Sequence, residues 1–244
     1  MRQRQKSGGN YFFIIFLIMM LVNSFQSGRF NNPRQWLFNT LMVLPAIVIG
    51  ITLHEFSHAF AAWKLGDSTP KAQGRITLNP LAHIDPLGVI ALIFIGFGWG
   101  RPVQVNPYAF RKNPRLSNFV VNIAGITTNF IIAILCFPLY LFAPGNILPT
   151  LLINIVGINL ILMLFNLLPI PPLDGFGIIT EIFGLRRFSW YSAFYNNGMM
   201  ILMVILIIPR FLGFDIIGTL LGSGFYSIMG FFRSFWVTIF IGFL

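Results

Sequence analysis

Long apolar runs joined by short polar loops constrain this chain more than any other feature. Of its 244 residues, 56% are hydrophobic and only 9% are charged, and the mean hydropathy is +0.80. A run of about 20 apolar residues can cross a bilayer as a helix, and soluble domains do not have this composition. We therefore expect an all-α polytopic membrane protein, folded as a single integral-membrane domain over residues 1–244.

The apolar runs predict about six transmembrane helices. A first helix is expected within the N-terminal segment 1–34 and the last two within the C-terminal segment 190–244, on either side of a core at about 36–184. The helices are expected over residues 11–22, 35–65, 117–142, 150–168, 190–208 and 215–244, with a short further helix over 174–184.

The segment between the second and third helices has a different composition. Residues 87–99 form an apolar run that is too short to cross easily and has basic residues on both sides, so we expect a re-entrant segment with both ends in the cytoplasm. β-Branched residues bounded by Gly, Pro and Asn at 73–78 and 101–106 predict two short membrane-associated β-strands. Irregular backbone at membrane depth is tolerated where it lines a wet cavity, so these strands indicate a hydrated cleft.

One apolar stretch, residues 44–65, carries two histidines and a glutamate. His54 and His58 are four residues apart, so on a helix both imidazoles lie on one face and can bind one ion. Glu55 lies about 100° around the helix from His54, within reach of a water molecule beside the metal. This is the His-Glu-x-x-His pattern of zinc peptidases, in which the Glu is the general base.

An ordinary polar patch is the alternative for these residues, because the five-residue pattern also occurs by chance in many helices. Ionisable side chains are costly in an apolar helix, and within a membrane they are functional by default. The apolar surroundings therefore favour metal binding.

A catalytic zinc site normally has three protein ligands and one open position, so a third ligand is required. The candidates are the other His and acidic side chains of the chain's core: His83, Asp67, Asp85, Asp174 and Glu181. Asp174 comes directly after a segment in which three prolines interrupt an apolar helix, which brings a carboxylate to membrane depth. Its alternative role is to cap the helix that follows.

The basic residues indicate topology rather than nucleic-acid binding. The formal net charge is +10, but the Lys and Arg residues flank apolar runs, as topology signals and contacts with anionic lipid require. Their distribution predicts a cytoplasmic N-terminus and a site nearer the cytoplasmic face. Cys136 is the single cysteine of the sequence, so an intrachain disulfide is impossible.

Two motifs together resemble the site-2 protease family of intramembrane zinc metalloproteases. The first is His54-Glu55-x-x-His58, and the second runs from Asn166-x-x-Pro169 to Leu173-Asp174-Gly175. The similarity extends through residues 74–88, 102–107 and 124–129, and covers about 44–181. The resemblance implies that His54, His58 and Asp174 bind one zinc ion, that Glu55 is the catalytic base, and that the substrates are single-span membrane proteins in the lipid bilayer.

The chain departs from the family pattern in two respects. Many relatives have Gly-Pro-x-x-Asn where this chain has Gly125-Ile-Thr-Thr-Asn129. No loop is long enough for the PDZ domain or the nucleotide-sensing domain of some relatives, so a compact form is expected.

Three further polar residues are candidates for contacts with substrate. Asn129 and Asn166 could donate to a developing oxyanion, although buried Asn residues in helices more often bond a neighbouring helix. His83 could approach the site from the cytoplasmic side, or bond local backbone only.

The predicted function is regulated intramembrane proteolysis, which is the hydrolysis of a peptide bond within or near a transmembrane segment. The protein is expected to be a multi-pass protein of the cell membrane of a prokaryote. The main alternative is a zinc or divalent-cation transporter, which would repeat acidic or His residues along a path across the bilayer. Here those residues gather at one depth. An inactive scaffold is disfavoured by the intact motif, and a bis-His haem protein by histidines that share one helix face.

Overall fold

The computed structural model describes residues 14, 17–19, 21, 22, 24–26, 28, 30–95, 98–211 and 215–241. Most of these residues are in helices. Three of these helices are long and apolar enough to cross a membrane: α2 (Pro33–Lys64), α5 (Pro114–Phe142) and α6 (Ile147–Asn166). Their lengths are about 48, 44 and 30 Å by helical rise, against a hydrocarbon core of about 30 Å. The all-α, membrane-type architecture is confirmed. The expected number of spans is not shown, and half of the residues of the first helix expected at 11–22 lie outside the described residues.

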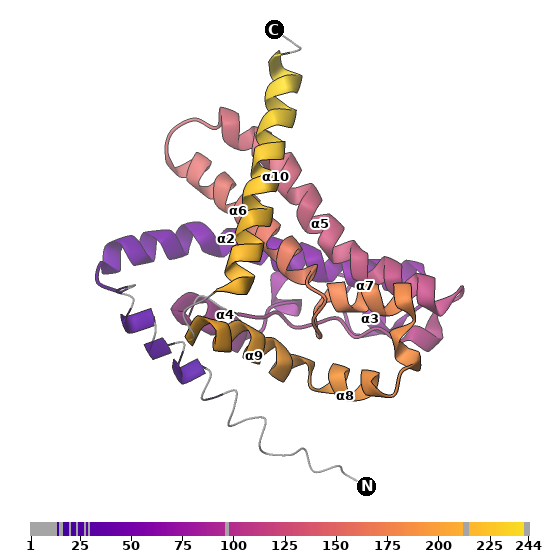
Figure 1. Ribbon diagram of the computed structural model, residues 1–244. Coiled ribbons are helices and arrows are strands. Elements are labelled where there is room, and N and C mark those ends of the chain that lie inside the picture. Colours follow the sequence, from indigo (N-terminus) through magenta and orange to yellow (C-terminus); the bar gives the residue numbers. More distant parts are fainter. Residues whose placement is uncertain are drawn as a thin grey trace.

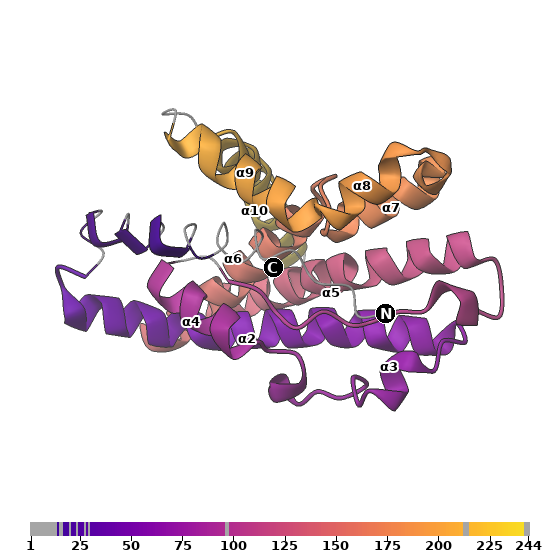
Figure 2. The ribbon, with the colours of Figure 1, turned by 90° about the horizontal axis from the view of Figure 1, so that it is seen from below.

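The three long helices pack against one another, and the shorter elements are arranged around them. α7 (Asp174–Phe183) packs on α5, and Figure 2 shows α5 between α7 and α2. α10 (Ile216–Ile241) crosses the bundle at a steep angle and contacts both α5 and α6 (Figure 1). The main apolar core lies where α5, α6 and α10 meet. It consists of Ile126, Ala133, Phe137, Val156, Leu160, Met163 and Phe232.

Asparagine–proline pairs start two of the long helices. Asn32 accepts a hydrogen bond from the N–H of Gln35, and Asn113 accepts from that of Arg115. The proline that follows each Asn takes the first helical position, where no N–H is needed. α2 and α5 therefore begin two and three residues before the starts expected at 35 and 117.

The two short β-strands expected at residues 73–78 and 101–106 are not formed. The first segment follows α3 (Thr69–Ala72) and turns through Gly74, which has a φ of +68°. The second is extended, but its backbone bonds to side chains of α2 and of neighbouring loops instead of to a strand. Within the described residues the β-type pairing is confined to a single bridge between Ile84 and Gly100.

The expected re-entrant stretch at 87–99 contains α4 (Pro86–Ile95), after which the chain returns beside the start of the helix. A Cβ atom on Gly88 would lie 2.0 Å from the carbonyl oxygen of Trp99, so the two arms touch through a glycine. The bridge between Ile84 and Gly100 closes this hairpin. Both ends of the stretch therefore lie together, and its re-entrant placement in a membrane stays a prediction.

The helix expected at 190–208 is divided into α8 (Trp190–Asn196) and α9 (Gly198–Phe211). The division falls at Asn196-Asn197-Gly198, where an Asn-Gly pair favours a turn. The chain is closely packed there, because a Cβ atom on Gly198 would lie 2.6 Å from Cβ of Pro171 and 2.9 Å from its carbonyl carbon. The remaining connections contain the 3₁₀ turns η1 (Pro80–Ala82), η2 (Pro107–Ala109) and η3 (Leu185–Arg187).

Candidate metal centre

The histidine pair of α2 converges on one point inside the bundle. The Nε2 atoms of His54 and His58 are 3.0 Å apart, and both side chains are buried. The convergence follows from the helix itself, since residues four apart are stacked on one face.

The third group comes from α7. Oδ2 of Asp174 lies 3.2 Å from Nε2 of His54 and 3.2 Å from Nε2 of His58. Asp174 is the first residue of α7, and Gly175 after it allows the turn from α6 to be tight, because a Cβ atom at 175 would lie 2.2 Å from the carbonyl oxygen of Leu167. The three side chains were predicted from two separate stretches of sequence, and the structure brings them together.

The other ring nitrogen of each histidine is bonded to α5. His58 donates from Nδ1 to the carbonyl oxygen of Val121 at 2.7 Å, and His54 donates from Nδ1 to Oδ1 of Asn129 at 2.6 Å. Asn129 is oriented by its own two donations, to the carbonyl oxygen of Gly50 at 3.2 Å and to Oδ1 of Asn159 at 2.8 Å. With the proton on Nδ1, each Nε2 presents a lone pair, which is the form of histidine that binds metals.

The donor set fits a tetrahedral metal ion such as zinc. Ligand atoms about 2.0 Å from a tetrahedral ion are about 3.3 Å from one another, close to the separations of 3.0 and 3.2 Å seen among these three atoms. Oδ2 of Asp174 is buried and has no hydrogen-bond donor in the described part of the chain. Three lone-pair atoms that face one another at this distance repel unless a cation lies between them, so the geometry favours a bound ion.

A glycine of α5 provides the space for the two imidazoles. A Cβ atom on Gly125 would lie 2.5 Å from Nε2 of His58 and 2.6 Å from Cε1 of His54. α5 can therefore approach α2 only because position 125 has no side chain. The sequence motif included Gly125, but the steric reason for it needed the structure.

Glu55 lies beside the centre and is not one of the three converging groups. Its Oε2 accepts a hydrogen bond of 3.0 Å from the backbone N–H of Val103, in the extended segment 101–106. The side chain is partly exposed, as expected for a base that must meet a water molecule.

The three further candidates lie in different surroundings. Asn129 is fully buried and its amide group is bonded as described above, while Asn166 donates to the carbonyl oxygen of Leu162 within its own helix. His83 is also fully buried, and its Nε2 donates to the carbonyl oxygen of Thr77 at 2.8 Å. Their contact with substrate stays a prediction.

The other acidic residues that were considered as third ligands are engaged elsewhere. Oδ1 of Asp85 accepts hydrogen bonds from the first N–H groups of α4, those of Leu87 and Gly88. Glu181 is paired with Arg186 at 2.7 Å, and Asp67 accepts two backbone N–H groups.

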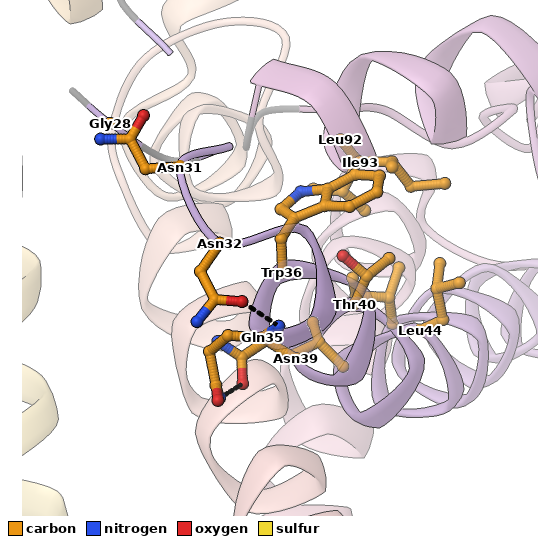
Figure 3. Close-up of a pocket in the computed structure, with 12 residues that line it drawn as sticks. Gly28, Asn31, Asn32, Gln35, Trp36, Asn39, Thr40, Leu44, Leu92 and Ile93 are labelled. Carbon is orange, nitrogen blue, oxygen red and sulfur yellow. Dashed lines mark hydrogen bonds between the residues drawn. The ribbon is translucent and has the colours of Figure 1, made fainter. Parts of the chain in front are cut away.

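A separate cavity of about 500 Å³ lies at the opposite end of α2. Figure 3 shows the neutral side chains of Asn32, Gln35 and Asn39 on one side of it, and Trp36 and Thr40 with the α4 residues Leu92 and Ile93 on the other. Its lining residues include no Asp, Glu, His, Lys or Arg. This cavity therefore offers no ionisable side chain for catalysis or metal binding.

The fold and the site together define a class, a helical membrane-type protein with a largely buried His-His-Asp cluster that could hold a metal ion. No family model matches the chain. It is 38% identical over 216 residues to "Putative zinc metalloprotease YwhC" of Bacillus subtilis, covering 82% of this chain and 96% of that protein. It is 31% identical over 188 residues to "Putative zinc metalloprotease Rip2" of Mycolicibacterium smegmatis, covering 72% and 71%.

Among solved structures, the site-2 protease from Methanocaldococcus jannaschii is similar over 87% of this chain and 85% of that one, with 21% identity and a TM-score of 0.47. The family assignment rests on the sequence relatives. This chain belongs to the same family as these putative zinc metalloproteases, and its two motifs are those that resemble the site-2 proteases.

Proposed function

We propose that the protein is an intramembrane zinc metalloprotease that hydrolyses a peptide bond within or near the transmembrane segment of single-span membrane proteins. The observation that carries this proposal is the convergence of His54, His58 and Asp174, with both Nδ1 atoms bonded to α5 and a glutamate one residue from the first ligand. The names of the relatives support zinc and proteolysis.

In this proposal His54, His58 and Asp174 hold one zinc ion. The ion would lower the pKa of a water molecule toward neutrality and polarise the scissile carbonyl. Glu55 takes a proton from the attacking water on its carboxylate and passes it to the leaving amine. Asn129 keeps His54 in the tautomer that leaves Nε2 free.

The depth of the site supports cleavage inside the bilayer on the cytoplasmic side. His54 lies ten residues before the last residue of α2, about 15 Å by helical rise, and 21 residues after its first residue, about 32 Å. Basic residues cluster beyond the nearer end, at Lys64, Lys71, Arg75, Arg111, Lys112 and Arg115. Since basic loops stay in the cytoplasm, we place this end of α2 there.

A substrate helix hides its peptide groups in its own hydrogen bonds, so it must unwind before water can attack. Glycine or proline near the scissile bond lowers the cost of unwinding, by about 1 kcal/mol for Gly and about 3 for Pro relative to Ala. We therefore expect cleavage at sites where the transmembrane segment of the substrate contains such residues.

The test compares wild-type protein with Glu55→Gln, both purified in detergent with zinc, on a panel of single-span substrates. The expected result is that the variant keeps one zinc per chain and loses cleavage, because Gln cannot accept the proton. Equal cleavage by both proteins would remove Glu55 from its role. Zinc flux into liposomes that persists in Glu55→Gln, without proteolysis, would identify a transporter.

A further inference from the structure

The extended segment 101–106, together with Gly100 before it, runs along the C-terminal half of α2. It contacts α2 and the residues that follow this helix at several points. Near its start, the backbone of Gly100 faces Ile51, since a Cβ atom at 100 would lie 3.0 Å from Cγ2 of that residue. In its middle, the N–H of Val103 donates to Glu55 at 3.0 Å. At its end, the N–H of Asn106 donates to Oδ2 of Asp67 at 2.7 Å.

Asp67 is the residue that fixes the end of this segment. It is fully buried, three residues beyond the end of α2, and its two oxygens serve two different parts of the chain. Oδ1 accepts from the N–H of Thr69 at 2.9 Å, and Oδ2 accepts from that of Asn106. Among the described residues it has no ion-pair partner. A buried carboxylate is costly to desolvate, so its retention needs a reason.

The two N–H groups supply that reason, because only a carboxylate accepts on both sides. An asparagine at position 67 could accept one N–H with its oxygen but would turn its own NH₂ group toward the other. One of the two hydrogen bonds, either that from Asn106 or that from Thr69, would then be lost. Asp67 thus joins the end of α2 to the extended segment through a contact that no neutral residue of the same shape reproduces.

The position of Asn106 restricts the position of Val103, because only two residues separate them. The segment is held on the other side of Val103 by Arg75, whose guanidinium donates to the carbonyl oxygens of Ala82 and, at 3.3 Å, Arg101. Between the two anchors, the side chain of Val105 packs against Ala62 and its neighbours in a small apolar cluster. The Val103 N–H is therefore fixed relative to α2.

We propose that Asp67 is a positioning residue for Glu55: by holding Asn106 it places the Val103 N–H against the Glu55 carboxylate. This inference rests on the proposed function, in which Glu55 is the base. An unrestrained glutamate samples several rotamers, and only those within hydrogen-bond reach of the water contribute to the rate. The Val103 N–H binds one carboxylate oxygen, restricts the rotamer, and leaves the other oxygen for the proton.

The kinetic test compares Asp67→Asn with the matched variant Asp85→Asn. A single oxygen of Asp85 accepts both of its N–H groups, so Asn can replace it there without losing either bond. For Asp67→Asn we expect kcat to fall about tenfold, a fraction of the 10²–10⁴ typical of a general base. KM is expected to change less than twofold, and zinc content to stay at one per chain. Asp85→Asn is expected to keep wild-type kcat.

A second variant and a spectroscopic measurement keep the test decisive. Val103→Pro leaves Asp67 in place and removes the N–H that contacts Glu55, although it also replaces the Val side chain and fixes φ at about −65°. Its kcat is expected to fall as in Asp67→Asn, and the double variant is expected to show no further loss. In ¹⁵N-valine spectra of the zinc-free protein, the Val103 amide resonance is expected to shift in both Glu55→Gln and Asp67→Asn.

Wild-type kcat in Val103→Pro, or a Val103 resonance that Glu55→Gln leaves unmoved, would overturn the proposal. A parallel loss of zinc and of kcat in Asp67→Asn would also overturn it, since the residue would then act on the whole site. None of these results touches the role of Glu55 itself, which Glu55→Gln decides separately.

Discussion

The Nδ1–H of His54 donates a hydrogen bond of 2.6 Å to Oδ1 of Asn129, so a side chain of α5 fixes the tautomer of a candidate ligand on α2. Asn129 can hold that orientation because its amide group is bonded to Gly50 and Asn159. The centre therefore depends on a chain of polar groups that crosses from α2 through α5 to α6. Such outer contacts usually tune metal affinity as strongly as some ligands do.

Asn129→Ala is expected to weaken zinc binding by about 10- to 100-fold, the usual effect of losing a hydrogen bond to a metal-bound histidine. The measurement is zinc occupancy against a competing chelator. Asn154→Ala is the control, because Asn154 also bonds α2, through the carbonyl oxygen of Met42, but at a distance from the ligands. Equal zinc affinity of Asn129→Ala and wild type would contradict the role assigned to Asn129.

Gly125→Ala is expected to abolish zinc binding and cleavage, although alanine is favoured over glycine within a helix by about 1 kcal/mol. The reason is steric, since the added methyl group would lie against both imidazoles. Gly230→Ala in α10 is the matched control, because a Cβ atom there meets nothing within 4 Å. We expect that variant to keep zinc and to unfold at the same or a slightly higher temperature. Full zinc content in Gly125→Ala would show that the helices can move apart.

Removal of zinc is expected to lower the thermal stability of the protein in detergent, because three facing lone pairs would lose the cation between them. A ligand at 100 times its Kd stabilises the folded state by about 2.7 kcal/mol. Melting curves with and without EDTA measure the effect, and added zinc should restore it. In Asp174→Ala, EDTA is expected to make no difference. A large EDTA effect in that variant would place the metal elsewhere.

Arg186→Ala is expected to destabilise the protein by about 1–3 kcal/mol. Glu181 is only 5% exposed and pairs with Arg186 at 2.7 Å, so the variant would leave a buried carboxylate unpaired. The value lies below the usual 3–5 kcal/mol because the Arg186 side chain is about half exposed. Arg187→Ala is the control, and its expected change is within 0.5 kcal/mol. Chemical denaturation in detergent measures both, and equal midpoints would contradict a stabilising pair.

The sequence predicted the donor set because each donor is specified locally. Two histidines four residues apart share a helix face whatever surrounds them, and the prolines before Asp174 break the helix by their own geometry. The family resemblance joined the two stretches. Helix starts were placed two to three residues late, although Asn32-Pro33 and Asn113-Pro114 are strong start signals that the sequence already contained.

What the sequence could not predict depends on contacts between distant segments. The composition of residues 73–78 and 101–106 suits strands, but a strand needs a partner, and here side chains such as Glu55 and Asp67 take the backbone N–H groups instead. The break between α8 and α9 falls at Asn196-Asn197-Gly198, a turn signal that the sequence already contained, but the close approach of Gly198 to Pro171 needed the structure. The closeness of Gly125 to the imidazoles is of the same kind.

More than one hundred residues separate His58 from Asp174 along the chain. Since polypeptides are made from the N-terminus, both histidines are synthesised before the carboxylate that completes the three-residue cluster. A newly made chain therefore cannot complete the cluster until α7 has been synthesised and has packed on α5. The order of synthesis itself delays the assembly of the proposed active site until the bundle has formed.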